Sequence, residues 1–340
     1  MKEKELKLLE FLYEKKLTYN ELLNTLNIRK ESLNKYLNDL KFNGYDWYKK
    51  YYSDGTTRID IFDYTNSEDN SISIITRPDE EKIKTLVISD LHLGCTIERL
   101  DLLDKTFNFA SKEGIHIIFG CGDLIDGVED RSAARNTIPD IHNQIEYLIK
   151  NYPYDKNILT FAVLGDHEGR ASRRNSVDIA KIINNSRNDL IISEQSHFCI
   201  NIKNEAIKLK HISELRDQEK INIFGHTHKY MASLHTNVNS FGILRNARVF
   251  DKNLMITAPS LSNGNQGMPS MLEMEIYFES GYISEVNLKE YGYFGRDKEM
   301  ILLSEANYSF LLPCVEDELI YNEEDYEEEK IIKKIKKIVK

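Results

Sequence analysis

The chain has only four cysteines among its 340 residues, and they lie far apart. They form no Cys-x-x-Cys pair, which argues against a disulfide framework and against a cysteine zinc site. No apolar run approaches the roughly 20 residues that cross a bilayer, so the sequence offers no membrane span. Residues 1–5 alternate in charge and lack the apolar core of a signal peptide. We therefore expect a cytoplasmic protein with reduced thiols and no membrane partner.

Basic residues are also in the minority, with 45 Lys and Arg against 55 Asp and Glu and a net charge of −10. This balance argues against a generic nucleic-acid binder. Residues 1–58 depart from it, because they hold 12 basic and 9 acidic residues. The length exceeds what one modest core needs, and an apolar content of 41% argues against disorder. The sequence therefore predicts two modules with different partners.

The pattern of residues 1–66 predicts three helices followed by a hairpin. Leucines at helical spacing predict a first helix over 3–16. A capping box that begins at Thr18 predicts the start of a second helix, and a third is expected to end at Gly44. The turn of a hairpin is indicated by Ser53-Asp54-Gly55. This order of elements resembles a winged helix-turn-helix domain.

The resemblance to a winged helix implies that the third helix and the hairpin contact nucleic acid. The side chains expected to do so are Arg29, Lys30, Asn34, Lys35, Asn38 and Lys41 on the helix and Lys49, Lys50 and Arg58 on the hairpin. Basic and amide groups of this kind bind phosphates and base edges. Two alternatives stay open, because the same residues could form a solvated face or dock another protein.

Residues 67–79 are expected to be a linker, and residues 80–300 an α/β domain. In that domain, apolar runs of strand length alternate with helical segments. The predicted strands are Thr85–Ser89, Ile115–Gly120, Ile158–Leu164, Ala206–Lys210 and Ile221–Gly225. Residues 301–340 are expected to form an acidic tail and a lysine-rich helix. The tail is either a solvated stretch or an inhibitory mimic of nucleic acid.

Acidic and histidine side chains follow the ends of the predicted strands. Their motifs are Asp90-Leu91-His92, Gly122-Asp123-Leu124-Ile125-Asp126, Gly165-Asp166-His167-Glu168, His211 and Gly225-His226-Thr227-His228. Each motif is a weak signal alone. Open α/β sheets place their sites at the carboxyl ends of strands, so we expect these side chains to meet at one edge.

The ordered set resembles the calcineurin-like metallophosphoesterases over roughly residues 84–260. That resemblance implies a two-sheet α/β/β/α sandwich with two divalent metal ions. It assigns Asp90, His92 and His228 to one ion and Asp166, His211 and His226 to the other, with Asp123 bridging the two. Mixed carboxylate and imidazole ligands favour Mn²⁺, with Fe and Zn as alternatives. A pair of such ions clamps a phosphate and neutralises charge during an in-line displacement.

The resemblance also implies a catalytic pair, His167 and Asp126. The histidine is expected near the leaving-group oxygen, with the aspartate orienting its ring. Asp166 departs from the family pattern, in which this position is Asn. An oxygen ligand is kept, but the amide donor is lost and a negative charge is added. Arg170, the first of three arginines that follow, is predicted to bind the substrate and to supply positive charge.

We therefore expect a metal-dependent phosphodiesterase, specifically a nuclease whose N-terminal domain contacts nucleic acid, with DNA favoured over RNA. A first alternative is a phosphoesterase for a cyclic nucleotide or dinucleotide, in which the N-terminal domain forms a homodimer. A second alternative is a non-catalytic scaffold that binds DNA.

Overall fold

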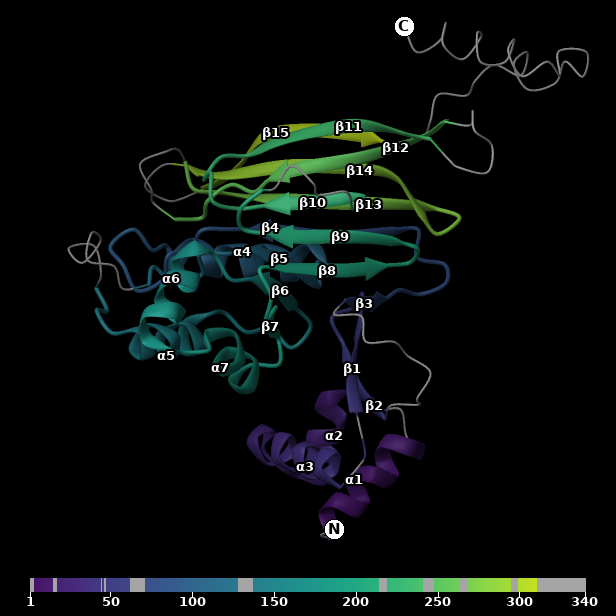
Figure 1. Ribbon diagram of the computed structural model, residues 1–340, viewed down its shortest axis with the longest axis vertical. Coiled ribbons are helices and arrows are strands. Elements are labelled where there is room, and N and C mark those ends of the chain that lie inside the picture. The colour runs from purple at the N-terminus through teal and green to yellow at the C-terminus, as the bar shows by residue number, and fades with distance from the viewer. Residues whose placement is uncertain are drawn as a thin grey trace, which may run out of the picture.

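The computed structural model describes residues 3–14, 17–43, 45, 47–61, 71–127, 137–213, 219–240, 248–262, 268–294 and 299–310. A small helical unit at the N-terminus lies beside a larger unit built on two sheets (Figure 1). No helix among the described residues is long and apolar enough to cross a bilayer.

The N-terminal unit contains three helices and a hairpin, in the predicted order. Its elements are α1 (Glu3–Glu14), α2 (Tyr19–Leu26), α3 (Lys30–Phe42), β1 (Trp47–Tyr52) and β2 (Thr57–Ile61). The predicted capping box is present, because the Thr18 hydroxyl accepts from the amide of Glu21 and the Glu21 carboxylate accepts from the amide of Thr18. Leu33 and Leu37 of α3 are fully buried in this unit's own core. The predicted helix end at Gly44 lies outside the described residues.

Two sheets packed face to face form the larger unit. One has the strand order β15-β14-β13-β4-β5-β6-β7, and the other β11-β12-β10-β9-β8-β3-β1-β2. The strands beyond the hairpin are β3 (Ile72–Ile75), β4 (Lys82–Ile88), β5 (Ile117–Cys121), β6 (Leu159–Val163), β7 (Leu190–Ile192), β8 (His197–Ile202), β9 (Glu205–Lys210), β10 (Ile221–Phe224), β11 (Met231–Ser240), β12 (Arg248–Thr257), β13 (Ser270–Glu279), β14 (Tyr282–Phe294) and β15 (Glu299–Ser309). Phe161 of one sheet and Ile207 of the other belong to the core between them. The predicted α/β sandwich of two sheets is confirmed.

Helices cover the outer face of the seven-stranded sheet. They are α4 (Leu100–Glu113), α5 (Ile141–Asn151), α6 (Asp166–Asn175) and α7 (Ile179–Ser186). A second core joins strand residues such as Ile118 to helix residues such as Leu102 and Ile145. Strands β4, β5 and β6 are parallel, and so are β9 and β10. The carboxyl ends of parallel strands meet at one edge, which is where the sequence motifs lie.

A single sheet connects the two units, through part of the segment predicted to be a linker. Strand β3 pairs in parallel with β1 of the hairpin and with β8 of the larger unit. Tyr51 of β1 is buried, and its ring packs edge-on against Phe161, with 5.2 Å between ring centroids. The linker prediction for residues 67–79 is therefore wrong at 72–75. A four-residue strand within a polar stretch gives too short an apolar run to be recognised.

The larger unit extends past its predicted end at residue 300. Strand β15 pairs with β14 along its length, and the hydroxyl of Tyr308 donates to the carbonyl of Ala232 in the other sheet. Residues 301–309 are therefore part of the sandwich rather than of a tail. The acidic run and the lysine-rich segment of the predicted tail lie outside the described residues.

Candidate metal centre

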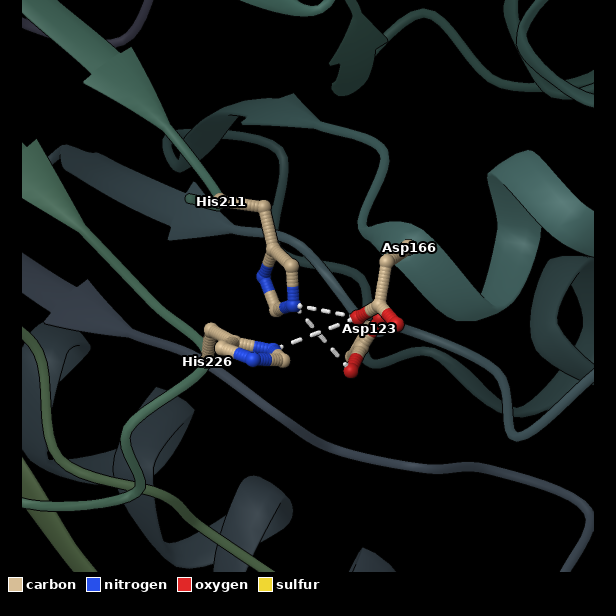
Figure 2. Close-up of side chains that lie close together, drawn as sticks. All are labelled: Asp123, Asp166, His211 and His226. Atoms are coloured by element: carbon tan, nitrogen blue, oxygen red, sulfur yellow. Dashed lines mark hydrogen bonds and ion pairs between the residues drawn. The ribbon is translucent and has the colours of Figure 1, made fainter. Parts of the chain in front are cut away.

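The predicted ligands all follow strand ends at one edge of the sandwich. Asp90 and His92 come after β4, Asp123 after β5, Asp166 at the start of α6 behind β6, His211 after β9, and His226 and His228 after β10. Figure 2 shows Asp123, Asp166, His211 and His226 pointing toward one another. The seven side chains form two groups, Asp123-Asp166-His211-His226 and Asp90-His92-His228, whose ligand atoms lie close enough to hold an ion.

In the first group, one imidazole nitrogen lies between two carboxylates. Nε2 of His211 is 3.0 Å from Oδ1 of Asp166 and 3.2 Å from Oδ2 of Asp123. Nδ1 of His226 is 3.3 Å from the same oxygen of Asp166. These contacts bring two aspartates and two imidazoles to one point.

In the second group, Oδ1 of Asp90 is 3.2 Å from Nε2 of His228. The rings of His92 and His228 stack, with 5.4 Å between centroids. Nε2 of His92 lies 3.8 Å from Oδ2 of Asp123, the oxygen that also faces His211. Asp123 therefore lies between the two groups, where a bridging ligand is expected.

Most candidate ligands have a backbone conformation that side chains other than glycine seldom adopt. Asp90, His92, Asp123, His226 and His228 have φ between 46° and 67°. Such a conformation costs of order 1–3 kcal/mol per residue and persists where the surroundings enforce it. Backbone strain of this kind is concentrated at functional sites. Its presence at five candidate ligands indicates that the strand ends form a functional site.

Two glycines allow the strand ends to approach each other. A Cβ on Gly165 would lie 2.0 Å from Oδ1 of Asp123, and a Cβ on Gly225 would lie 2.2 Å from the carbonyl oxygen of Cys121. Real Cβ atoms do not make such contacts, so the motifs require glycine directly before Asp166 and His226.

Glu168, to which the sequence analysis gave no role, connects two of the loops. Its buried carboxylate accepts from the amides of Ile125 at 2.8 Å and Gly165 at 2.7 Å. Burial, together with the charge of Asp123, raises the pKa of Glu168 to about 7. The sequence signal was available, since a glutamate three residues into a helix commonly bonds back to its first amides.

A second supporting residue, Ser260, also escaped the sequence analysis. Its hydroxyl donates to the carbonyl of Asp90 at 3.1 Å, from the loop that follows β12. No motif connects the two positions, which are 170 residues apart.

The orientation of His211 directs one ring nitrogen toward the centre. Its Nδ1 donates to the carbonyl of Cys121 at 2.7 Å, so Nε2 is the atom that faces Asp123 and Asp166. Burial opposes protonation of this ring, but hydrogen bonds to the two carboxylates outweigh it and raise the pKa to about 11. A ring fixed by a carbonyl on one nitrogen is the usual arrangement of a metal-binding histidine.

The catalytic pair predicted from sequence is arranged differently. Nδ1 of His167 bonds the backbone carbonyl of Asp126 at 2.5 Å, whereas Oδ1 of the Asp126 carboxylate lies 3.2 Å from Nδ1 of His92. The prediction that the Asp126 side chain orients His167 is therefore wrong. Its main chain does so, and its carboxylate faces His92. Burial opposes protonation of His167, but Asp123 and the Asp126 carbonyl outweigh it and raise its pKa.

Arg170 pairs with the aspartate that departs from the family pattern. It lies one helical turn after Asp166 on α6, and its guanidinium donates to Oδ2 of that carboxylate. The hydrogen bond from His211, helped by the charge of Arg170, lowers the pKa of Asp166. The added negative charge is therefore compensated within the helix. Substrate binding by Arg170 stays a prediction.

The geometry of the two groups fits bound cations. Among the described residues, Oδ1 of Asp90 and Nε2 of His92 are buried and make no hydrogen bond. Buried polar atoms of this kind are normally paired, and a metal ion would satisfy both. The oxygen and imidazole donors suit Mn²⁺, Fe or Zn. Asp90 is fully buried whereas His226 is 52% exposed, so the centre opens to solvent on the side of His226.

Two of the nine residues predicted to bind nucleic acid instead contact the larger unit. The ammonium of Lys30 donates to the carbonyl of Ser186 at 2.7 Å, and that of Lys49 donates to Oδ1 of Asn188 at 3.1 Å. The prediction is wrong for this pair, because their charged ends face the protein. The hairpin turn that follows Lys49 is docked in the same way, since a Cβ on Gly55 would lie 1.9 Å from the carbonyl oxygen of Asn157.

Of the seven remaining residues predicted to bind nucleic acid, three contact other side chains of the N-terminal unit and four are exposed. Lys50 pairs with Asp60 at 2.5 Å, and the guanidinium of Arg58 lies 5.0 Å from the ring centroid of Tyr52. Asn34 accepts a hydrogen bond from the hydroxyl of Tyr19. The exposed members are Arg29, Lys35, Asn38 and Lys41.

A cleft of about 560 Å³ lies between the two units and is separate from the metal centre. Tyr19 and Lys30 line it from one side, and Tyr154 and Arg187 from the other. None of the seven candidate ligands lines this cleft. The candidate metal centre is therefore at the strand ends and not in the cleft.

The fold and the converging side chains support a phosphoester hydrolase. Residues 83–228 match the family model for the calcineurin-like phosphoesterases, and this part of the chain is such a domain. No curated protein matches the chain. Among solved structures it is similar to the nuclease MPE of Pseudomonas putida, with 14% identity, a TM-score of 0.30 and coverage of 61% of this chain and 84% of that one. A likeness of this size carries no weight for the substrate.

Proposed function

We propose that the protein is a phosphodiesterase with two divalent metal ions, and that its substrate is nucleic acid, DNA rather than RNA. The observation that carries the proposal is the position of Asp123 between two groups of ligands, Asp90-His92-His228 and Asp166-His211-His226. Two ions at these groups would clamp the phosphate and neutralise charge in an in-line displacement. Mn²⁺ is the expected metal.

His167 is the proposed general acid. Its Nδ1 is held by the carbonyl of Asp126, so a proton carried on Nε2 faces the centre, 3.9 Å from Oδ2 of Asp123. Asp123 and Asp126 raise the pKa of His167, which favours the protonated ring. A protonated imidazole there can donate to the leaving oxygen of a phosphodiester.

The substrate class is inferred from the N-terminal unit. Three helices and a hairpin follow the order of a winged helix, and α3 together with its N-cap residue exposes Arg29, Lys35 and Lys41. Cations on a helix of this kind bind phosphates. The unit is joined to the phosphoesterase domain by a continuous sheet, so nucleic acid held there would stay near the centre.

One observation favours the alternative of a small phosphoester substrate. The hairpin is docked on the larger unit through Lys49 and Gly55, so part of the N-terminal unit has a structural role. In that alternative the unit is a dimerisation module, and a cyclic nucleotide or dinucleotide is cleaved.

The deciding experiment incubates the full-length protein and Mn²⁺ with labelled single- and double-stranded DNA, RNA, a cyclic dinucleotide and bis-p-nitrophenyl phosphate. We expect cleavage of DNA and of the nitrophenyl diester. Turnover of the diester and the cyclic dinucleotide without cleavage of any polymer would contradict the nuclease proposal. The Asp123→Asn variant, inactive on all substrates, controls for contaminating nucleases.

A further inference from the structure

A second basic surface lies outside the N-terminal unit, on the helices that lead away from the metal centre. Helix α6 begins at Asp166 of the centre, and α7 follows it after a short turn at Ser176. The two helices carry Arg170, Arg173, Arg174 and Lys181. We call these four residues the basic ridge.

The arginines of the ridge share one face of α6. Positions 170, 173 and 174 are related by three and four residues. Position 166 precedes 170 by one turn and 173 and 174 by about two, so all four lie on one side of the helix. Arg173 and Arg174 are exposed, whereas Glu168 and Ala171 on the other side are buried. The cationic face of α6 therefore starts at the metal centre and is turned to solvent.

The acidic residues of these two helices offset only part of this charge. Asp166 pairs with Arg170, and Glu168 is buried and bonded to two amides. Asp178 caps α7, where it accepts from the amide of Lys181. Residues 166–186 hold four cations against these three carboxylates, whereas the whole chain has a net charge of −10.

The ridge ends where α3 of the N-terminal unit begins. The ammonium of Lys30 donates to the carbonyl of Ser186, the last residue of α7. Arg29, beside Lys30, is exposed. In Figure 1, α6, α7 and α3 follow one another down one side of the molecule. At 1.5 Å per residue the two helices of the ridge cover at most about 27 Å, or roughly eight phosphates of one duplex strand.

We propose that the basic ridge binds the phosphodiester backbone of nucleic acid and guides it between α3 and the metal centre. The proposal rests on the nuclease function and adds to it a path for the polymer. The recognised chemistry is the sugar-phosphate backbone, which DNA and RNA share, and positive side chains on an exposed helix face complement it. Arg173, Arg174 and Lys181 are the residues that would contact phosphates.

The test compares Arg173→Gln/Arg174→Gln with a control of equal charge change, Lys105→Gln/Lys112→Gln, on exposed positions of α4. Binding of labelled DNA and RNA is measured with Mn²⁺ in a His167→Ala background over a range of salt. Each lost phosphate contact lowers the salt slope by about 0.9 for duplex DNA. We expect the ridge variant to lose at least about tenfold in affinity and up to about two in slope, with the control unchanged.

Cleavage in the otherwise wild-type protein separates this proposal from the nuclease proposal. We expect the ridge variant to cleave DNA at least about tenfold more slowly while its turnover of bis-p-nitrophenyl phosphate stays within twofold. Equal DNA binding and cleavage by the ridge and control variants would overturn the ridge alone. Failure of the wild type to bind or cleave any nucleic acid, with the diester still hydrolysed, would overturn both. Should the double variant not fold, Lys181→Gln on α7 takes its place, with an expected slope change of about one.

Discussion

At the scale of single residues, the candidate centre depends on the burial and the contacts of three aspartate carboxylates. Asp90 is fully buried, Asp123 faces both groups of ligands, and Asp166 lies at the edge beside Arg170. Burying negative charge is unfavourable unless positive charge compensates it, so the arrangement of these carboxylates favours bound cations. The pairing of Arg170 with Asp166 offsets the one carboxylate that replaces an amide in the family pattern.

His167→Ala tests the proposed general acid. We expect this variant to lose roughly 10²–10⁴ in kcat on bis-p-nitrophenyl phosphate, because the proton donor to the leaving oxygen is removed. Its Mn²⁺ affinity, measured by calorimetry, should change little. His142→Ala, on an exposed position of α5, is the matched control. A His167→Ala enzyme with full turnover would show that the ring has no role in the chemical step.

Asp126→Asn tests the corrected position of that carboxylate. Because it faces Nδ1 of His92 rather than His167, its loss should weaken Mn²⁺ binding by roughly 10–100-fold. Calorimetric titration of the metal measures this directly. Unchanged affinity together with a large fall in kcat would return Asp126 to the role first predicted from sequence.

At the scale of elements, the hairpin has a structural function. Strand β1 continues the sheet of the phosphoesterase domain through β3, and the turn at Gly55 lies against Asn157. Lys49 is held at this contact, where burial and the charge of Lys30 lower its pKa to about 8. The hairpin therefore fixes the N-terminal unit on the catalytic one.

Gly55→Ala tests the docking of the hairpin. Gly55 and Gly114 both have positive φ, 77° and 66°, so alanine strains the backbone at either position. Only at Gly55 does the added methyl meet a carbonyl oxygen, whereas at Gly114 nothing lies within 4 Å. We expect Gly114→Ala to cost about 1 kcal/mol and Gly55→Ala clearly more, by urea unfolding. Equal losses for the two variants would contradict the contact with Asn157.

The half-buried Lys49 predicts a dependence of stability on pH. Its pKa is about 8 in the folded protein and about 10.4 when exposed, so the unfolded state binds more protons between these values. Stability of the wild type should therefore rise from about pH 8 toward pH 10, relative to Lys49→Met. Thermal unfolding at several pH values measures the difference, and Lys156→Met, at an exposed position, is the control. A difference that is flat or falls with pH would mean that the pKa of Lys49 is not lowered in the folded protein.

Much of the element order was predictable from sequence, for a physical reason. Parallel strands buried on both faces, such as β5 and β6, are continuous apolar runs and are easily recognised. Strand β3 was missed because its four residues are stable only through pairing with β1 and β8, which are distant in sequence. The extension of β15 was missed because its exposed edge alternates weakly between polar and apolar residues.

At the scale of the whole molecule, the convergence of the seven candidate ligands followed from motifs at strand ends. What the sequence could not predict was the choice between two rings for Asp126, since both lie within reach of a carboxylate at that position. The docking of Lys30 and Lys49 was equally hidden, because it depends on how two separately folded units pack.

Anomalous diffraction at the manganese edge, from crystals grown with Mn²⁺, is the most direct measurement. We expect two peaks per chain about 3.5–4 Å apart, with Asp123 between them. The Asp90→Asn variant should keep the peak beside His211 and lose occupancy at the peak beside His228. No peak, or a single one remote from Asp123, would contradict the account.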